Sequence, residues 1–230
     1  LPDSATPSGA GEPTAAPQSG GTGHGTPTWL TWLRRSSWVL MAIAVMILGY
    51  VGVLVGYQSY EQHQLSSQWD VATNNGQVPD FVFTKEAMSF PTVHPHLADG
   101  QAMAKLTMPK VGFSAIVTEG EQTGLLTSGP GHDEHTSYPG EGGLILIGNH
   151  NGFSGSWDGL HEGDEIDVET TYGRFHYRIT RRFITGGDDQ SIVDAHYSTE
   201  TLVVTTCWPL WEGAFAKDRL VFVATPIRQG

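Results

Sequence analysis

Three residues that can act together in acyl transfer occur in the C-terminal half of the chain. Cys207 is the only cysteine of the sequence and ends a β-branched segment, residues 201–206. His150 follows an apolar segment, and Arg219 stands twelve positions after the cysteine. A thiol needs a nearby base or cation to be nucleophilic at neutral pH, and acyl transfer needs donors directed at the developing oxyanion. His150, Cys207 and Arg219 are therefore candidate catalytic residues.

Short β-branched segments separated by turn signals predict a single all-β domain over residues 99–230. Their spacing favours a barrel or a sandwich. The candidate strands are residues 102–108, 114–118, 143–147, 165–170, 175–183, 201–206 and 220–224.

Two of these strands end in residues that could do chemistry. The apolar residues 144–147 lead into Gly148, Asn149 and His150, and the strand before Cys207 ends in the same way. If the two strands are neighbours, the imidazole and the thiol share one end of the sheet. Arg219, which opens the last strand, can then reach the same place.

Residues 38–57 are uncharged, and their number matches the ~20 residues that a helix needs to cross a bilayer. Arg34 and Arg35 precede this segment, whereas the next basic residue is Lys85. The positive-inside rule predicts a cytoplasmic N-terminus and an external C-terminal domain. We expect a disordered cytoplasmic tail (1–33), a basic flank with a single transmembrane helix in the cell membrane (34–57), a juxtamembrane stalk (58–98) and the all-β domain (99–230).

Charge excludes one class of partner. The formal net charge is −12, and the only charged residues before position 58 are Asp3, Glu12, Arg34 and Arg35, which balance. The external part therefore carries all of the net negative charge. Nucleic acids need a basic surface, so we expect no nucleic-acid partner.

The order His150, Cys207, Arg219 resembles that of the sortase family of cysteine transpeptidases, over about residues 97–227. In support, Met-Pro-Lys-Val-Gly stands at 108–112, Gly-Pro-Gly-His at 129–132, Pro-Gly-Glu-Gly-Gly at 139–143 and Thr-Thr-Cys-Trp-Pro at 205–209. The segments around the cysteine and arginine look closest to class D or class E sortases. The chain departs from the family where Asn149 stands between Gly148 and His150, since most members place Gly directly before the His.

The resemblance implies an eight-stranded β-barrel and cleavage of a C-terminal Leu-Pro-x-Thr-Gly sorting signal between Thr and Gly. Cys207 would form a thioester, His150 would protonate the departing amine, and Arg219 would stabilise the oxyanion. Thr206 and Asn149 are candidate substrate-binding residues. The partners implied are surface proteins that bear the signal and an amine acceptor, either a lipid-linked peptidoglycan precursor or a pilin lysine.

Two other readings stay open. An L,D-transpeptidase is disfavoured because that class places Arg two residues after the nucleophile, where this chain has Pro209. A catalytically inactive, membrane-anchored β-sandwich scaffold or adhesin would leave Cys207 as a buried inert thiol, which is common for cysteine. The scaffold explains the strands but not the three reactive residues at strand ends.

Other polar clusters carry no cofactor or metal assignment. Residues 132–135, His-Asp-Glu-His, look like a metal site, but zinc usually needs three or four protein ligands. We interpret them as a solvated loop. Glu119, Glu121, Asp188 and Asp189 could be brought together, as in calcium-binding sortases, but the sequence does not place them, and no ion is expected.

Overall fold

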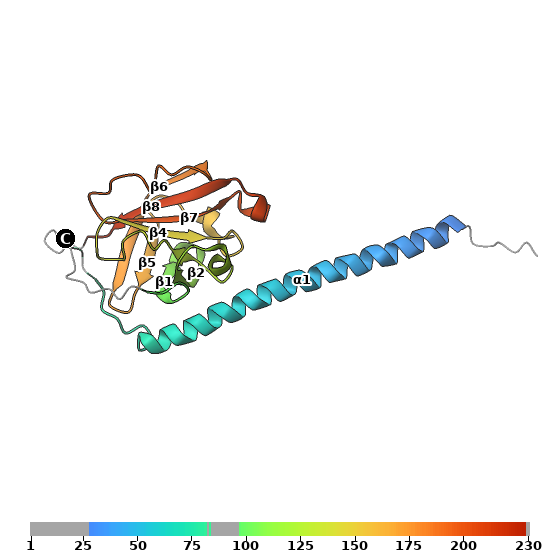
Figure 1. Cartoon of the computed structure of the whole chain (residues 1–230), viewed down its shortest axis with the longest axis horizontal. Coiled ribbons are helices and arrows are strands. Elements are labelled where there is room, and N and C mark those ends of the chain that lie inside the picture. Colours follow the sequence, from blue (N-terminus) through green and yellow to red (C-terminus); the bar gives the residue numbers. More distant parts are fainter. Residues whose placement is uncertain (1–27, 82, 84–96, 229–230) are drawn as a thin grey trace, which may run out of the picture. The chain divides into compact units, whose positions relative to one another are not determined.

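The computed structural model describes residues 28–81, 83 and 97–228. Figure 1 shows their helices and strands. In chain order these are α1 (Thr28–Ala72), β1 (Ala102–Met108), β2 (Phe113–Glu119), α2 (Thr123–Leu126), β3 (Gly131–His132), β4 (Leu144–Asn149), β5 (Glu165–Glu169), β6 (Arg174–Gly186), β7 (Thr201–Trp208) and β8 (Asp218–Pro226). Short 3₁₀ helices cover Pro109–Val111, Trp157–Gly159 and Leu210–Phe215.

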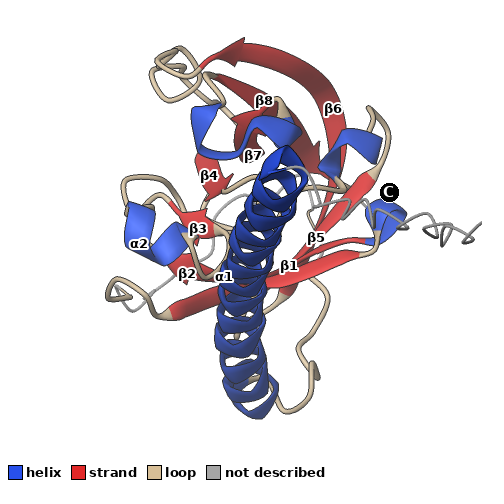
Figure 2. Cartoon of the chain, turned by 90° about the vertical axis from the view of Figure 1, so that its right-hand side faces the viewer, coloured by secondary structure: helices blue, strands red, loops and turns tan. Residues whose placement is uncertain are grey.

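The eight strands of the described residues close into a barrel, which confirms the expected fold class. Their order is β1-β2-β3-β4-β7-β8-β6-β5, and β1 closes the ring by pairing with both β2 and β5. Figure 2 shows the strands curving around one interior. Seven strands overlap the segments predicted from sequence. Strand β3 was not predicted, because two residues are too few to show an alternating pattern.

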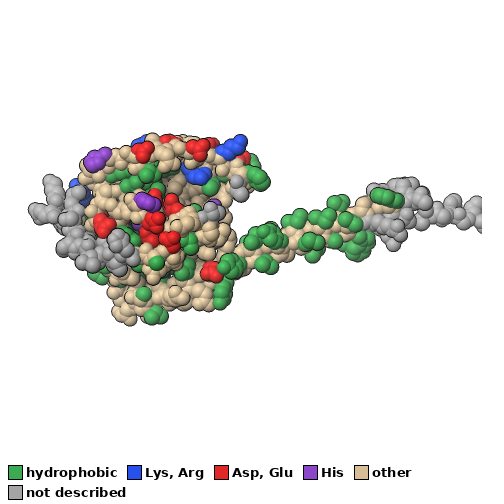
Figure 3. Space-filling model, in the orientation of Figure 1, with side chains coloured by type: hydrophobic (Ala, Val, Ile, Leu, Met, Phe, Trp, Pro, Cys, Tyr) green, Lys and Arg blue, Asp and Glu red, His purple; other side chains and the backbone are tan. Residues whose placement is uncertain are grey.

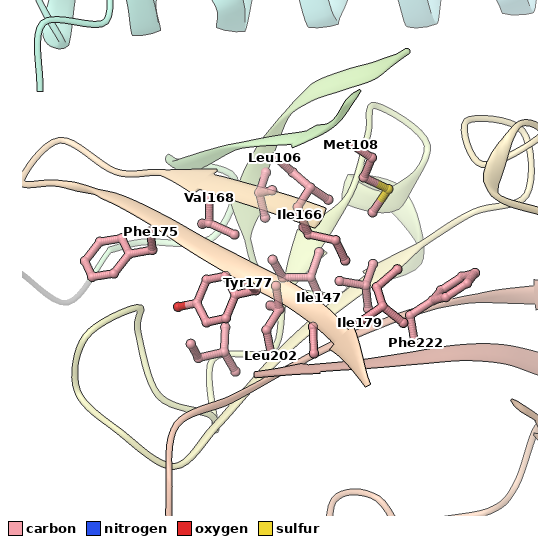
Figure 4. Packing of buried hydrophobic residues seen from close by; sticks show 14 of the residues in the cluster. Leu106, Met108, Ile147, Ile166, Val168, Phe175, Tyr177, Ile179, Leu202 and Phe222 are labelled. Carbon is pink, nitrogen blue, oxygen red and sulfur yellow. The ribbon is translucent and has the colours of Figure 1, made fainter. Parts of the chain in front are cut away.

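The barrel interior holds the main hydrophobic core. Its side chains come from alternate positions of the strands, as the period of two requires. Ile147 of β4, Leu202 of β7 and Phe222 of β8 are fully buried in this cluster, and Figure 4 shows them among their neighbours. Because one set of alternate residues fills the interior, the other set of β4, β7 and β8 lies on the outer face of the sheet.

Helix α1 extends beyond both ends of the predicted membrane span. Among the described residues, this is the one helix that is long and apolar enough to cross a membrane, and Figure 3 shows hydrophobic side chains along it. Residues 58–72 contain no Gly or Pro and several good helix formers, so the helix continues past the apolar segment. It ends before Asn74, Asn75 and Gly76, which all have positive φ.

The chain divides into two compact units, one up to Tyr50 and the other from Val51 onwards. In the second unit, the C-terminal part of α1 contacts the barrel. The side-chain amide of Gln62 forms two hydrogen bonds with the backbone of Ile116. It accepts one from the Ile116 N–H at 2.9 Å and donates one to the Ile116 carbonyl at 3.2 Å, as a neighbouring strand would. Trp69 is buried and donates to Glu169 at 3.1 Å.

Parts of the predicted domain division lie outside the described residues. These are residues 1–27 of the tail, residues 82 and 84–96 of the stalk and residues 229–230 of the all-β domain. Residues 28–33, expected in the tail, already belong to α1. The barrel strands run from Ala102 to Pro226, within the predicted 99–230 domain, and the division into four parts stays a prediction.

Candidate active site

Strand pairing brings the three candidate catalytic residues to one end of the sheet. Strands β4 and β7 are parallel neighbours with Asn149 opposite Thr206, so their C-terminal ends meet, which is the condition under which His150 and Cys207 share one end of the sheet. Strands β7 and β8 are antiparallel, with Cys207 directly opposite Arg219. His150 follows Asn149 at the end of β4. Residues separated by up to 69 positions are therefore adjacent for a simple topological reason.

The three residues line one cavity of about 440 Å³ on the outer face of β4, β7 and β8. Its apolar part comes from a second hydrophobic cluster that includes Leu146, Val203 and Val221. The remaining lining residues are Glu121, Leu126, Asp133, Gly148, Asn149, His150, Thr185, Gly187, Asp189, Gln190, Ile192, Val193, Thr205, Thr206, Cys207 and Arg219. Cys207 is half-buried, so its thiol is neither fully enclosed nor fully exposed.

The two proposed substrate-binding residues lie at the cavity but are mostly buried. Thr206 is 1% exposed, and its hydroxyl lies 2.5 Å from that of Ser154. Asn149 is 4% exposed. Both alternate with cavity-facing neighbours, and Thr205 is the more accessible of the two threonines. The alternation therefore favours Thr205 over Thr206 for a side-chain contact with substrate, and a direct substrate contact by Asn149 or Thr206 stays a prediction.

The cavity disfavours the charged form of His150. Burial lowers the pKa of this imidazole below its ordinary 6.5, and the nearby Arg219 charge lowers it further. No hydrogen bond joins the side chains of His150 and Cys207 within the described part of the chain. Both observations argue against a resting thiolate–imidazolium pair, since each removes a source of stabilisation for the imidazolium.

Arg219 is half-buried at the start of β8, and most of its donors remain available. Its Nη1 donates to the carbonyl of the adjacent Asp218 at 3.2 Å, and no ion pair to Arg219 occurs among the described residues. Gly187 lines the cavity beside it and donates its N–H to the Lys217 carbonyl at 2.9 Å. A Cβ at Gly187 would press on that carbonyl, so glycine permits this close approach of the two segments.

Glu121 is a cavity residue to which the sequence assigned no role. It precedes α2, and burial, together with the Asp133 charge, raises its pKa to about 7. The charges of His132 and Arg219 and a hydrogen bond from the Gly148 backbone act in the opposite direction. No sequence motif marks this residue, because its position follows from the path of the segment between β2 and β3.

The interpretation of residues 132–135 as a solvated loop is wrong for His132. This residue belongs to β3 and is fully buried, with Nδ1 3.2 Å from each oxygen of Glu119 and Nε2 3.1 Å from the Ser137 carbonyl oxygen. His135 is 81% exposed and contacts Asp133 instead. The two histidines therefore do not converge, and the described residues contain no group of three metal-binding side chains.

The fold and the cavity define a closed β-barrel protein with a thiol, an imidazole and a guanidinium at one end of its sheet. The model of the Sortase domain family matches residues 106–227. This covers more than half of the chain, which therefore belongs to the sortase family.

Individual relatives agree with this assignment. Sortase D of Bacillus subtilis (strain 168) is 34% identical over 111 residues, which are 48% of this chain and 56% of that protein. The chain thus matches little more than half the length of this relative. The Sortase D5 transpeptidase of Clostridium perfringens is 29% identical with a TM-score of 0.53, covering 57% of this chain and 82% of that one. Sortase E from Streptomyces avermitilis, 24% identical with a TM-score of 0.50, covers 57% and 91% respectively and supports the fold alone.

Proposed function

We propose that the protein is a membrane-anchored cysteine transpeptidase that cleaves a Leu-Pro-x-Thr-Gly sorting signal between Thr and Gly. The product would be joined to an amine acceptor, either a lipid-linked peptidoglycan precursor or a pilin lysine. The observation that carries this proposal is the shared cavity of His150, Cys207 and Arg219, which three separate strands bring together. Membership of the sortase family supports the same reaction.

The first half of the reaction forms a thioester. The Cys207 thiolate attacks the carbonyl carbon of the signal's Thr, and the electron pair moves onto the carbonyl oxygen. Arg219, register partner of Cys207, donates hydrogen bonds to this oxyanion. Collapse of the intermediate breaks the Thr–Gly bond, and the imidazolium of His150 gives its proton to the departing Gly amine.

The second half transfers the acyl group. Neutral His150 accepts a proton from the incoming amine, whose nitrogen attacks the thioester carbon. The C–S bond then breaks, which restores the thiolate of Cys207 and leaves a new amide bond. Because the pKa of His150 is lowered, its neutral form predominates near neutral pH and suits this base step, whereas the acid step draws on a smaller imidazolium fraction.

We also propose a cytoplasmic N-terminus and an external barrel, anchored through residues 38–57. The basic pair Arg34-Arg35 before the span supports this orientation. In a Cys207→Ala background, a cysteine placed at Ser8 should be protected from a membrane-impermeant thiol reagent in intact cells and should react after lysis. Labelling of Ser8→Cys in intact cells would reverse the orientation.

The reaction is tested with a library of sorting-signal peptides, an added amine and the full chain in detergent micelles. Mass spectrometry of the products should show cleavage between Thr and Gly and transfer to the amine. The Cys207→Ala chain should form neither product while its circular dichroism spectrum stays unchanged. Turnover by that variant would refute the cysteine mechanism.

The inactive scaffold makes a different prediction for the same protein. An inert filler thiol should resist alkylation in the folded chain, whereas a thiol at an open cavity should react. The half-buried state of Cys207 favours reaction. Resistance of Cys207 to a small alkylating reagent, combined with the absence of cleavage across the library, would support the scaffold.

A further inference from the structure

Glu121 reaches into the cavity next to β4, the strand that ends just before His150. A Cβ built on Gly148 would collide with the Glu121 carboxylate oxygen Oε1, so the carboxyl group occupies the space that a side chain at position 148 would fill. Glu121 and Arg219 line the same cavity and lie close enough for their charges to interact. The carboxyl is therefore part of the surface that a bound peptide would meet.

Three carboxyl groups line this cavity, and two of them take part in two hydrogen bonds each. Asp133 accepts hydrogen bonds from the backbone N–H and ring of His135, at 2.9 and 3.1 Å. Asp189 accepts from the Thr185 hydroxyl and, at 2.9 Å, from the Ser191 N–H. Glu121 forms no ion pair with any side chain among the described residues, and its hydrogen bond comes from the Gly148 backbone. Of the three, Glu121 has the most acceptor capacity left for a ligand.

We propose that Glu121 is a specificity-determining residue: it accepts a hydrogen bond from a cationic or donor-bearing side chain of the bound peptide and disfavours an acidic one. This inference rests on the proposed function, because it takes the ligand of the cavity to be the sorting peptide. A half-buried carboxylate interacts more strongly with a ligand charge than an exposed one does, since less water screens it.

The ionisation of Glu121 should make the preference for one peptide over another depend on pH. Burial and the Asp133 charge raise its pKa to about 7, against the opposing effects of His132 and Arg219. The carboxylate therefore forms as the pH rises through about 7, and discrimination against an acidic peptide should increase from pH 6 to pH 8. A glutamine at this position cannot ionise, so its preference should stay constant over this range.

Binding is measured first, because it does not depend on turnover. The probes are labelled peptides containing Leu-Pro-Lys-Thr-Gly or Leu-Pro-Glu-Thr-Gly, and a series in which the Lys/Glu exchange is moved to each flanking position. Fluorescence anisotropy with the full-length Cys207→Ala chain should show, at one position, at least about fivefold tighter binding of the Lys peptide at pH 8. Adding Glu121→Gln should reduce this ratio to about one.

Asp189→Asn is the matched control, since it removes another cavity carboxylate that already has partners. Its Lys/Glu ratio should stay close to that of the parent chain. The same ratio is then read as kcat/KM in the chain with Cys207 intact. An equal ratio in the Glu121→Gln and parent chains, or an equal loss in Asp189→Asn, would overturn the role of Glu121.

The two proposals fail in different ways. Absence of cleavage with a Glu121-dependent binding preference would overturn the transpeptidase and leave the specificity residue standing. Cleavage of Lys and Glu peptides at equal rates at every position would leave the transpeptidase standing and overturn the specificity residue. Failure of both peptides to bind at any position would overturn the inference together with its assumed ligand.

Discussion

The barrel interior and the outer cavity each contain a histidine and a glutamate, but these residues have different surroundings in the two regions. In the interior, His132 and Glu119 are 0% and 2% exposed, and both ring nitrogens of the histidine have partners. In the cavity, His150 and Glu121 are half-buried and form no ion pair within the described residues. The two regions are neighbours, because β3 pairs with β4.

The difference separates a structural role from a chemical one. A buried polar group is costly unless it is paired, so the interior pair satisfies its own hydrogen-bonding groups and stabilises the junction of β2, β3 and β4. The cavity groups keep free donors and acceptors, which a substrate can use. Mutations in the interior should therefore cost stability, and mutations in the cavity should cost activity.

The largest expected effect is on activity at His150. His150→Gln removes the proton donor and acceptor, so kcat/KM for a sorting peptide should fall by about 10² to 10⁴-fold. The free energy of unfolding should change by less than about 0.5 kcal/mol, because the side chain is not packed in the core. Peptide kinetics and urea denaturation check both values. A large loss of stability with normal turnover per folded molecule would show that His150 has a structural role and not a catalytic one.

His132 should show the opposite pattern. His132→Ala empties a fully buried position and removes one of the hydrogen-bond partners of Glu119, which together should cost about 3 kcal/mol of stability. Urea denaturation measures the loss. The exposed His135 provides the control, and His135→Ala should change stability by less than about 0.5 kcal/mol. Equal effects of the two substitutions would remove the distinction between interior and surface.

A substitution at Arg219 tests whether a second cavity residue contributes to activity and not to stability. An ammonium cannot reproduce the planar donor fork of a guanidinium, so Arg219→Lys should lose about 2 to 4 kcal/mol of transition-state stabilisation. The loss should appear in kcat, with an unchanged circular dichroism spectrum. Arg178 pairs with Glu165 on the surface, and Arg178→Lys should leave kcat unaffected. Activity of Arg219→Lys that merely follows the folded fraction would make Arg219 structural.

The smallest expected effect is a gain of stability at Glu121. The pKa of its folded state is raised from 4.5 to about 7, so ionisation destabilises the fold progressively above pH 4.5 and fully above about 7. Glu121→Gln should therefore stabilise the chain by about 2 kcal/mol at pH 8 and by almost nothing at pH 4. Urea denaturation at both pH values measures this. A gain that is equal at pH 4 and pH 8 would contradict the raised pKa.

The strands and the catalytic candidates could be predicted from local sequence, because a period of two and residues at strand ends are visible without a structure. To bring His150, Cys207 and Arg219 to one place, it was enough to assume that their strands are neighbours, and the strand register confirms this assumption. The position of Glu121 in the cavity could not be predicted from local sequence. Its carboxyl group fits there because Gly148, which is 27 positions later, has no side chain. The burial of His132 was missed for a similar reason: its partner Glu119 lies on another strand, and the local sequence is polar.

The central claim is that Cys207 forms a thioester with the Thr carbonyl of a sorting signal. The most direct test is the intact mass of the full chain after brief incubation with a Leu-Pro-x-Thr-Gly peptide and no added amine. We expect an added mass equal to the acyl group that ends in the Thr carbonyl, which is the Thr-terminated fragment less one water, located on the tryptic fragment that contains Cys207 and lost when an amine acceptor is added. Cleavage of the peptide without this adduct, or an adduct on another residue, would contradict the account.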